Sequence, residues 1–296
     1  MARSEELASR GFEILEREQY APDVFRITVK APRVPPRAEA GQFIIVRVDE
    51  KGERIPLTLV DFSNERGSVD MVFQVVGTTT DKLSRLSPGD CVADVVGPLG
   101  RPTEVGDFGR VACVGGGVGI AALYPIARAM VKAGNDVKVL IGSRDKEHLI
   151  LVDRFEKLEA GLELATDDGS VGIKGFVAAL LLRAAEDWKP DRVIAVGPVP
   201  MMSAVSTLTK ERGIPTVVSL NAIMLDATGM CGTCRVEVGG ETKFSCVDGP
   251  EFDAHQVDFD LLISRLDVYK SEEKESWERF RETAKDYKHP CEQLER

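Results

Sequence analysis

The sequence predicts a β-barrel, an α/β domain with a parallel sheet, and a small cysteine-rich module with a helical tail, in that order. Three observations support this: short alternating strands in the first third, strand–helix alternation in the middle, and glycines and cysteines gathered near the C-terminus. A chain of 296 residues is also long for one domain. The expected parts are a barrel at 1–106, an α/β domain at 107–221, a metal module at 222–258 and a helical tail at 259–296.

Composition excludes several classes of protein. The net charge of −10 argues against a nucleic-acid partner or an anionic membrane surface, because both need a basic patch. No apolar run reaches the ~18 residues of a transmembrane helix, and the charged N-terminal segment lacks the apolar core of a signal peptide. We therefore expect a cytoplasmic protein. Its six cysteines are then expected to be ligands or small buried residues rather than a disulfide framework.

The first part reads as antiparallel β-structure. Residues 23–30 alternate apolar and polar side chains, which is the period of a half-buried strand. Pro, Gly and Asp fill the short turns, as in an antiparallel barrel or sandwich. Further strands are expected at 41–48 and 68–76, and one helical piece at 80–86.

The second part alternates apolar strands with helices, which makes a parallel sheet covered on both faces. Ligands bind such sheets at the carboxyl ends of the strands. Strands are expected at 110–114, 136–141, 162–166, 192–196 and 215–220, and helices at 120–134, 201–213 and, in the tail, 259–266.

Three cysteines in the third part are spaced C-x2-C-x11-C: Cys231, Cys234 and Cys246. The plant-type spacing for a two-iron cluster is C-x4-C-x2-C with a distant fourth cysteine. Asp226 stands at the first position of that template. A carboxylate is a harder ligand than a thiolate but can bind iron. The spacing therefore favours a 2Fe–2S cluster held by these four residues.

Two alternatives to this cluster stay open. A structural zinc ion could use the same three thiolates, although His255 has poor finger spacing to complete the site. Alternatively, Asp226 merely caps a turn and Cys291 supplies the fourth ligand. Cys91 and Cys113 lie in apolar strands and are expected to be small buried residues.

Glycines follow the first strand of the α/β part and precede a helix, where backbone amides favour a pyrophosphate. The match to G-x-G-x-x-G is imperfect because Ile120 replaces the third glycine, and a tight turn without a ligand is the alternative. Two other strand ends lie at the same sheet edge and support a dinucleotide site. The candidate residues are Gly115, Gly116, Gly117, Val118, Gly119, Asp167, Asp168, Gly197, Pro198 and Met201.

The barrel contains candidate flavin contacts in the stretch RIPLT. Arg54 could pair with a phosphate, and the hydroxyl of Thr58 could hydrogen-bond a flavin ring nitrogen. The helix that begins after Gly77 offers amides to a second pyrophosphate. Taken singly, each of these could be an ordinary barrel turn.

The order of these motifs resembles the ferredoxin-reductase-like electron-transfer subunits. That family includes the subunit paired with class 1B dihydroorotate dehydrogenase and the small subunit of NADH-dependent reduced ferredoxin:NADP oxidoreductase, also called sulfide dehydrogenase beta subunit. The resemblance covers about residues 8–265. The dihydroorotate-linked pattern has four cysteines, whereas the bifurcating oxidoreductase has an aspartate at the first position. Asp226 therefore favours the second type, and Thr79, where the first type prefers glycine, departs from the first.

The resemblance implies the cofactors FAD, a 2Fe–2S cluster and NAD(H), and a larger flavin and iron–sulfur partner subunit through which ferredoxin is reached indirectly. It implies hydride exchange between NAD(H) and FAD and single-electron transfer through the cluster. The alternatives are an electron transfer subunit of class 1B dihydroorotate dehydrogenase, or a docking relay with an empty dinucleotide site. The implied FAD residues are Arg54, Pro56, Leu57, Thr58, Val72, Phe73, Gln74, Thr79 and Thr80; Gly115 to Gly119, Asp167 and Asp168 would hold NAD, with Gly197, Pro198 and Met201 over the nicotinamide.

Three further expectations concern single residues and the tail. Arg144 sits where a 2′-phosphate could be met, although the resemblance favours NAD. His148, His255 and His289 form no recognisable triad and are expected at the surface. The charged tail beyond residue 266 is expected to be a solvated helix that packs on a partner.

Overall fold

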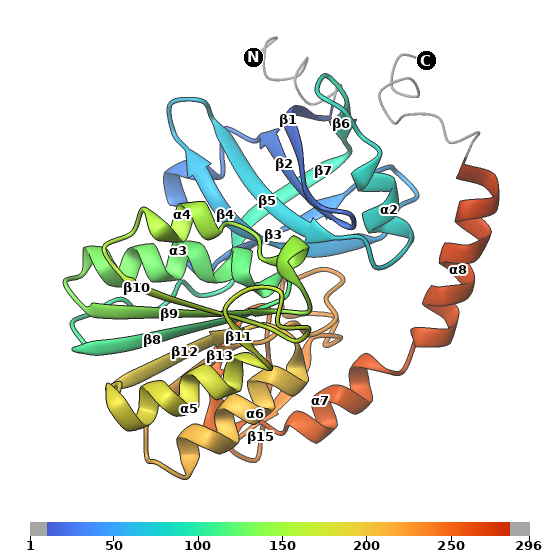
Figure 1. Ribbon diagram of the computed structural model, residues 1–296. Coiled ribbons are helices and arrows are strands. Elements are labelled where there is room, and N and C mark those ends of the chain that lie inside the picture. The colour runs from blue at the N-terminus through green and yellow to red at the C-terminus, as the bar shows by residue number, and fades with distance from the viewer. Residues whose placement is uncertain (1–10, 285–296) are drawn as a thin grey trace.

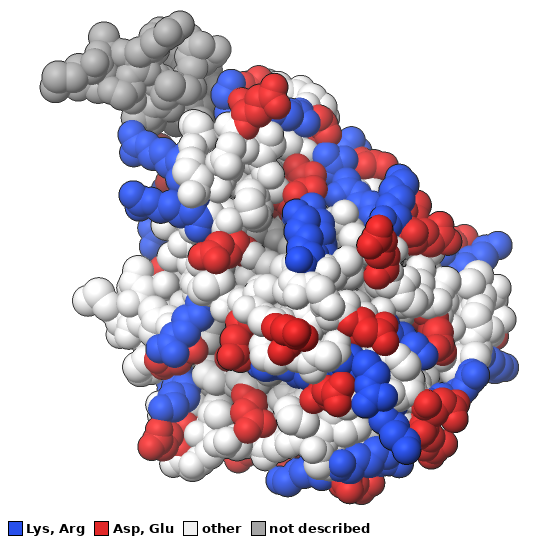
Figure 2. Space-filling view, turned by 90° about the vertical axis from the view of Figure 1, so that its left-hand side faces the viewer, with Lys and Arg blue, Asp and Glu red and all other residues white. Residues whose placement is uncertain are grey.

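The computed structural model describes residues 11–284. Two seven-stranded sheets and a two-stranded hairpin form its framework, and Figure 1 shows the first sheet above the second, with a long terminal helix at one side. No helix among the described residues is long and apolar enough to cross a membrane. Figure 2 shows basic and acidic side chains mixed over one face of the molecule.

The first sheet is antiparallel throughout and forms the expected barrel-like domain. Its strand order is β6-β1-β2-β5-β4-β3-β7. Apolar side chains from the inner face of each strand fill its centre, among them Ile27, Leu59 and Phe73. The strands are β1 (Phe12–Ala21), β2 (Val24–Lys30), β3 (Phe43–Arg47), β4 (Arg54–Ser63), β5 (Ser68–Gln74), β6 (Cys91–Val92) and β7 (Asp94–Leu99), with η1 (Pro35–Arg37) and α2 (Thr78–Ser84) between them.

The second sheet has the order β11-β10-β9-β8-β12-β13-β16 and is parallel except at one edge. There β16, which lies inside the predicted metal module, pairs antiparallel with β13. The sheet therefore continues past residue 221, where the sequence predicted its end. The strands are β8 (Arg110–Gly116), β9 (Asp136–Ser143), β10 (Gly161–Thr166), β11 (Ile173–Lys174), β12 (Arg192–Val196), β13 (Thr216–Ser219) and β16 (Glu251–Asp253).

Helices cover both faces of this sheet, as the strand–helix alternation predicts. On one face, α3 and α4 pack their apolar residues against the sheet and against the barrel strands β4 and β5. On the other face, α5 and α6 share a core with the metal module. The helices are α3 (Gly119–Lys132), η2 (Lys146–His148), α4 (Val152–Glu156), α5 (Val177–Asp187) and α6 (Val199–Lys210).

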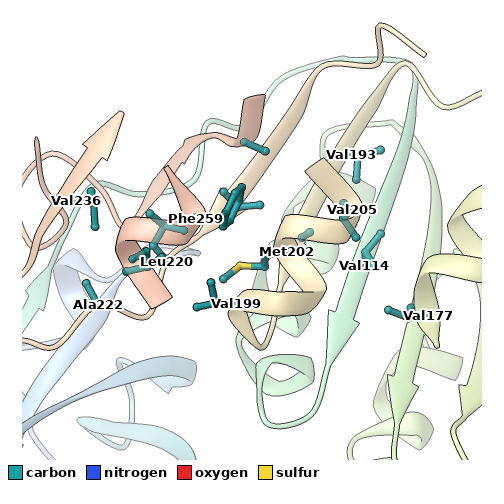
Figure 3. Close-up of a cluster of buried hydrophobic side chains, with 14 of the residues drawn as sticks. Val114, Val177, Val193, Val199, Met202, Val205, Leu220, Ala222, Val236 and Phe259 are labelled. Carbon is teal, nitrogen blue, oxygen red and sulfur yellow. The ribbon is translucent and has the colours of Figure 1, made fainter. Parts of the chain in front are cut away.

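The metal module is packed onto the α/β domain rather than standing apart. Val236 from its hairpin and Phe259 from the following helix share one buried cluster with Val199 and Met202 of α6. Figure 3 shows Phe259 near Val199 and Met202, with Val236 at the left edge of the group. The core therefore fixes the cysteine loop relative to the sheet. The module contains β14 (Arg235–Val238), β15 (Glu241–Phe244) and η3 (Ala254–Gln256), and α7 (Phe259–Leu266) follows it.

The terminal helix α8 (Lys270–Thr283) returns to the barrel, where it lies beside α2 (Figure 1). None of its residues is buried, which agrees with a solvated helix. It is held by polar contacts: the Trp277 indole Nε1 donates to Asp81 Oδ2 at 2.8 Å, and the hydroxyls of Thr78 and Ser276 lie 3.1 Å apart. The helix thus packs on this chain's own α2, and the expected partner contact is not needed to place it.

Candidate functional site

One face of the barrel looks toward the α/β domain. Leu59 of β4 belongs to the barrel core, whereas its neighbour Val60 packs in the cluster built around α3. Side chains alternate along a strand, so Thr58 lies on the same face as Val60. Leu59 pairs with Met71 of β5, which places Val72 on this face as well. Thr58 and Val72 therefore face the α/β domain, but Val72 is buried in the cluster around α3 and neither residue lines the cavity between the domains.

The other predicted flavin residues fall into two groups. Arg54 is exposed at the start of β4 and so accessible to a phosphate. Leu57 instead packs against the barrel core. Phe73 is also in that core, its ring stacked on Phe25 with centroids 6.1 Å apart. Its side chain therefore does not face the α/β domain, and only its backbone could contact a flavin. The reason is the alternation of side chains along β5, which turns Val72 toward the α/β domain and Phe73 into the barrel core.

The predicted phosphate contacts at α2 already have partners in the chain. The Thr80 hydroxyl accepts hydrogen bonds from the amides of Val76 and Gly77 at 3.0 and 3.1 Å, which caps the helix. Thr79 is buried and donates to Glu53 Oε2 at 3.2 Å. Both hydroxyls therefore shape this turn, and a ligand would have to use backbone atoms or displace these bonds.

The glycine turn joins β8 to α3, and the helix begins without a side-chain cap. A helix start suits an anion, but the amides of Gly117, Ile120 and Ala121 already donate to the carbonyl oxygens of Gly142, Gly117 and Val118 at 3.2, 3.2 and 3.0 Å. Gly117 has a φ of +54°, which favours glycine. A Cβ on Gly119 would lie 2.6 Å from the Val196 carbonyl oxygen and 2.7 Å from Gly197 Cα. The turn therefore needs glycine both for its conformation and for the close approach of α3 to β12.

A cavity of about 560 Å³ lies at the carboxyl ends of the strands and is lined from both domains. Of the predicted residues it brings together Gln74 from the barrel with Gly116, Gly117, Val118, Asp167, Pro198 and Met201 from the α/β domain. Residues that the sequence did not assign also line it: Val24, Gly142, Ser143, His148, Ile150, Phe176, Val177, Ala178, Pro200 and Ala204. The strand-end rule that selected Asp167 would have found Ser143, which ends β9.

Three site expectations change in the structure. His148 lines the cavity and is buried, so its predicted surface position is wrong. Asp168 does not line the cavity: its Oδ1 accepts from the amide and hydroxyl of Ser170 at 2.9 and 2.7 Å, and these bonds hold the pKa of Asp168 below its usual value. His255 is partly buried, with Nε2 3.0 Å from the Thr209 hydroxyl. His289 lies outside the described residues.

The loop 226–246 places the four predicted cluster ligands as two pairs. The Asp226 carboxylate accepts from the amide of Thr228 at 3.0 Å and from that of Cys231 at 3.1 Å, and these bonds lower its pKa. The thiols of Cys234 and Cys246 interact with each other, and burial followed by this contact raises the pKa of Cys246 to about 12. Hydrogen bonds from Thr233 lower the pKa of the exposed Cys231 thiol.

These pairs test which metal the loop fits. Within residues 11–284, no three Cys, His, Asp or Glu side chains converge on one point as a single metal ion requires. Two irons bridged by sulfides take two protein ligands each, and the pairs Asp226 with Cys231 and Cys234 with Cys246 match that demand. The hydrogen bonds that Asp226 accepts also agree with the alternative in which Asp226 caps a turn and is not a ligand. In that alternative the fourth ligand is Cys291, which lies outside the described residues.

Cys91 and Cys113, the remaining cysteines within residues 11–284, are buried, as expected. Burial raises the pKa of the Cys113 thiol to about 12, so it stays protonated in β8. Cys91 is disulfide-bonded, which the composition did not lead us to expect.

An antiparallel barrel joined to an α/β domain with a glycine turn, and then to a cysteine loop, defines an electron-transfer protein of the ferredoxin-reductase-like class. Family models match two parts of the chain: the oxidoreductase NAD-binding domain at residues 113–207 and the iron–sulfur cluster binding domain of dihydroorotate dehydrogenase B at residues 221–258. A structure of a P450 reductase from Amycolatopsis, 23% identical over 69% of this chain and 66% of its own, shares the fold with a TM-score of 0.60.

Closer relatives exist over nearly the whole chain. A Thermotoga maritima protein named dihydroorotate dehydrogenase B (NAD(+)), electron transfer subunit homolog is 50% identical over 92% of this chain and 96% of its own. A solved structure described as the NADH-dependent reduced ferredoxin-NADP oxidoreductase is 48% identical over 91% of this chain and 98% of its own, with a TM-score of 0.86.

The chain belongs to the family of dihydroorotate dehydrogenase B electron transfer subunits and their homologues. This confirms the resemblance found in the sequence. The family models and the fold support an NAD(H)-dependent oxidoreductase subunit with a 2Fe–2S cluster, FAD and NAD(H) as cofactors. The domains for NAD and for the iron–sulfur cluster make it an electron transfer subunit.

Proposed function

We propose that this protein exchanges hydride between NAD(H) and FAD and passes electrons through its 2Fe–2S cluster to a larger flavin and iron–sulfur subunit of an electron-bifurcating ferredoxin:NADP oxidoreductase. Ferredoxin is reached through that partner, and the complex is cytoplasmic. The observation that carries the proposal is the cavity of about 560 Å³ shared by the barrel and the α/β domain. A flavin on the barrel face and a nicotinamide on the strand ends would meet there.

The residues of this chain have positioning roles in the reaction. Gly116 and Gly117 let the backbone approach the pyrophosphate of the dinucleotide, at the uncapped start of α3. Pro198 and Met201 line the same cavity and would cover the nicotinamide. The Thr58 hydroxyl, on the barrel face opposite, would hydrogen-bond a flavin ring nitrogen.

The cofactors supply the redox chemistry, because a flavin accepts a hydride and can release electrons singly to an iron–sulfur centre. Asp226, Cys231, Cys234 and Cys246 would hold that centre, in the two pairs described above. No side-chain acid or base is needed for hydride transfer itself. The chain therefore contributes binding, orientation and the exclusion of water from the cavity.

The choice of partner rests on Asp226 and on the relatives. The likeness to the NADH-dependent reduced ferredoxin-NADP oxidoreductase structure, at 48% identity, supports the bifurcating complex, and an aspartate at the first ligand position agrees with that resemblance. A second candidate, the electron transfer subunit of a class 1B dihydroorotate dehydrogenase, is supported by the name of the 50% identical relative and by the iron–sulfur family model. Both candidates share the NADH and flavin chemistry.

Two measurements test the proposal. The protein purified anaerobically from its host is first analysed by mass spectrometry for what accompanies it. A partner with its own flavin and several iron–sulfur motifs supports the bifurcating complex, whereas a dihydroorotate dehydrogenase supports the second candidate. The isolated subunit, loaded with FAD, is then mixed with NADH or NADPH in a stopped-flow instrument. NADH should bleach the flavin absorbance; a protein that responds to neither nucleotide would be a relay without a working dinucleotide site.

A further inference from the structure

A compact polar group joins the two domains at the mouth of the cavity. Asp23 lies in the turn between β1 and β2, and Gln74 ends β5, so both belong to the barrel. Arg144 and His148 follow β9 and belong to the α/β domain. Gln74, Arg144 and His148 line the cavity. The two domains therefore touch at the point where their ligands would meet.

Asp23 is the centre of this group and contacts the other three side chains. Its Oδ2 accepts from Gln74 Nε2 at 2.8 Å and lies 3.5 Å from a terminal nitrogen of Arg144. Its Oδ1 lies 3.0 Å from His148 Nε2. The Asp23 carboxylate thus connects Gln74, at the end of β5 in the barrel, to Arg144 and His148 of the α/β domain.

The α/β side of the group is itself held in place. His148 Nδ1 lies 2.6 Å from Asp145 Oδ1, and the same oxygen accepts from the amides of Glu147 and His148 at 2.9 and 3.1 Å. The imidazole also contacts the guanidinium of Arg144. Because both the ring and its backbone are fixed by one aspartate, His148 presents a defined edge to the barrel.

The carboxylate of Asp23 faces hydrogen-bond donors and a positive charge across the domain boundary. Burial alone would raise the pKa of Asp23, but hydrogen bonds from Gln74 and His148 and the charge of Arg144 hold it below its usual value. Asp23 is therefore ionised at neutral pH and faces cationic or hydrogen-bonding groups. Arg144 lies 3.5 Å from Asp23 and 3.5 Å from Asp145.

Another interdomain contact lies away from the cavity. Asp61 of β4 pairs with Arg128 of α3 at 3.1 Å and approaches Arg154 of α4 at 3.9 Å, and none of the three lines the cavity. The two domains are thus joined at more than one place. Of these two contacts, only the group around Asp23 borders the cavity in which the flavin and the nicotinamide would meet. Its removal should alter geometry at that space more than it alters the fold.

We propose that Asp23, Gln74, Arg144 and His148 form an interdomain latch that sets the spacing between the flavin face of the barrel and the nicotinamide site. These are positioning residues, not catalytic ones. The inference rests on the proposed function, because it assigns the latch to hydride exchange in this cavity. Hydride transfer needs its reacting atoms ~3–3.5 Å apart, and a misplacement of ~1 Å can cost about 100-fold in rate.

The test uses the full-length subunit loaded with FAD and the variants Asp23→Ala, His148→Ala and their combination. Asp94→Ala is the matched control, because Asp94 pairs with Arg47 inside the barrel and its side chain is 32% exposed, against 30% for Asp23. Stopped-flow reduction by NADH gives the limiting rate and the apparent Kd, and the long-wavelength charge-transfer absorbance reports stacking of nicotinamide on flavin. Hydrogen exchange over residues 20–26 and 143–150 reports the latch without any need for turnover.

The latch predicts a limiting rate about 10- to 100-fold lower in Asp23→Ala and His148→Ala, with less than about threefold change in Kd and a weaker charge-transfer band. The double variant should lose no more than either single one, since the residues act as one unit. His148→Gln, which keeps a donor for Asp23, should recover part of the rate.

Unchanged rates and unchanged exchange in Asp23→Ala, relative to Asp94→Ala, would overturn the latch. So would equal losses in Asp94→Ala, which would indicate general destabilisation. If NADH fails to reduce the unmodified protein, the proposed function fails. The exchange measurement then still decides whether Asp23 holds the two domains together.

Discussion

Replacing Gly119 by alanine separates the packing role of the glycine turn from its role toward a ligand. Gly119 is the first residue of α3, where alanine would ordinarily favour the helix by up to ~1 kcal/mol. In this structure the new Cβ would lie 2.6 Å from the carbonyl oxygen of Val196 and 2.7 and 2.8 Å from Gly197 Cα and N. All three are backbone atoms of β12 and the turn after it, so no side chain can rotate away.

The steric clash of the new Cβ should therefore outweigh the gain in helix propensity, and Gly119→Ala should lower the stability of the protein. Overpacking against a fixed neighbour costs about 1–3 kcal/mol, and each kcal/mol lowers the Tm of a domain of this size by ~2–4 °C. Thermal unfolding of the protein without NADH measures the change. Gly161→Ala is the control, because its Cβ would meet nothing closer than 3.7 Å, and it should shift stability by no more than ~0.5 kcal/mol. A Gly119→Ala protein as stable as the control would refute the packing argument and leave the ligand as the only reason for glycine here.

Three further predictions concern the cluster, the latch and the terminal helix. Asp226→Cys should change both the EPR spectrum and the reduction potential of the 2Fe–2S cluster, because ligand type tunes such centres. The pKa of Asp23 is lowered in the folded protein, so the stability that wild type holds over Asp23→Asn should be complete above the unfolded value of 3.8 and disappear as pH falls through the folded pKa. Trp277→Ala removes the bond to Asp81, so α8 should become accessible to limited proteolysis while the Tm changes little.

Each of these has an outcome that contradicts it. If neither signal of the cluster changes in Asp226→Cys, the aspartate is a turn cap and not a ligand. A stability difference between wild type and Asp23→Asn that grows toward acid pH would mean that Asp23 is not ionised in the latch. Cleavage of α8 at the same rate in wild type and Trp277→Ala would show that the indole does not hold the helix on α2.

Local sequence patterns were sufficient wherever the structure depends on neighbours along the chain. The alternation in residues 23–30 identified β2, and the strand–helix order identified the parallel sheet, because periodicity reports which side chains share a face. The glycines at 115–119 and the spacing of Cys231, Cys234 and Cys246 pointed to the sites because each motif is contained in one loop. These signals, taken in order, also identified the family.

The tertiary structure decided what depends on segments distant in sequence. Asp23 and His148 are 125 positions apart, and no spacing rule joins a barrel turn to the end of a short helix, so His148 was placed at the surface. The strand β16, which lies in the metal module, pairs with the edge strand β13 of the α/β sheet. Likewise, Trp277 of α8 donates a hydrogen bond to Asp81, which is 196 positions away in the sequence. Sequence thus determined three of the seven barrel strands, the parallel strands β8, β9, β10, β12 and β13, the motifs and the class of protein. Packing alone determined which side chains of two domains meet around the cavity, because such contacts arise from the docking of surfaces and leave no period in the chain.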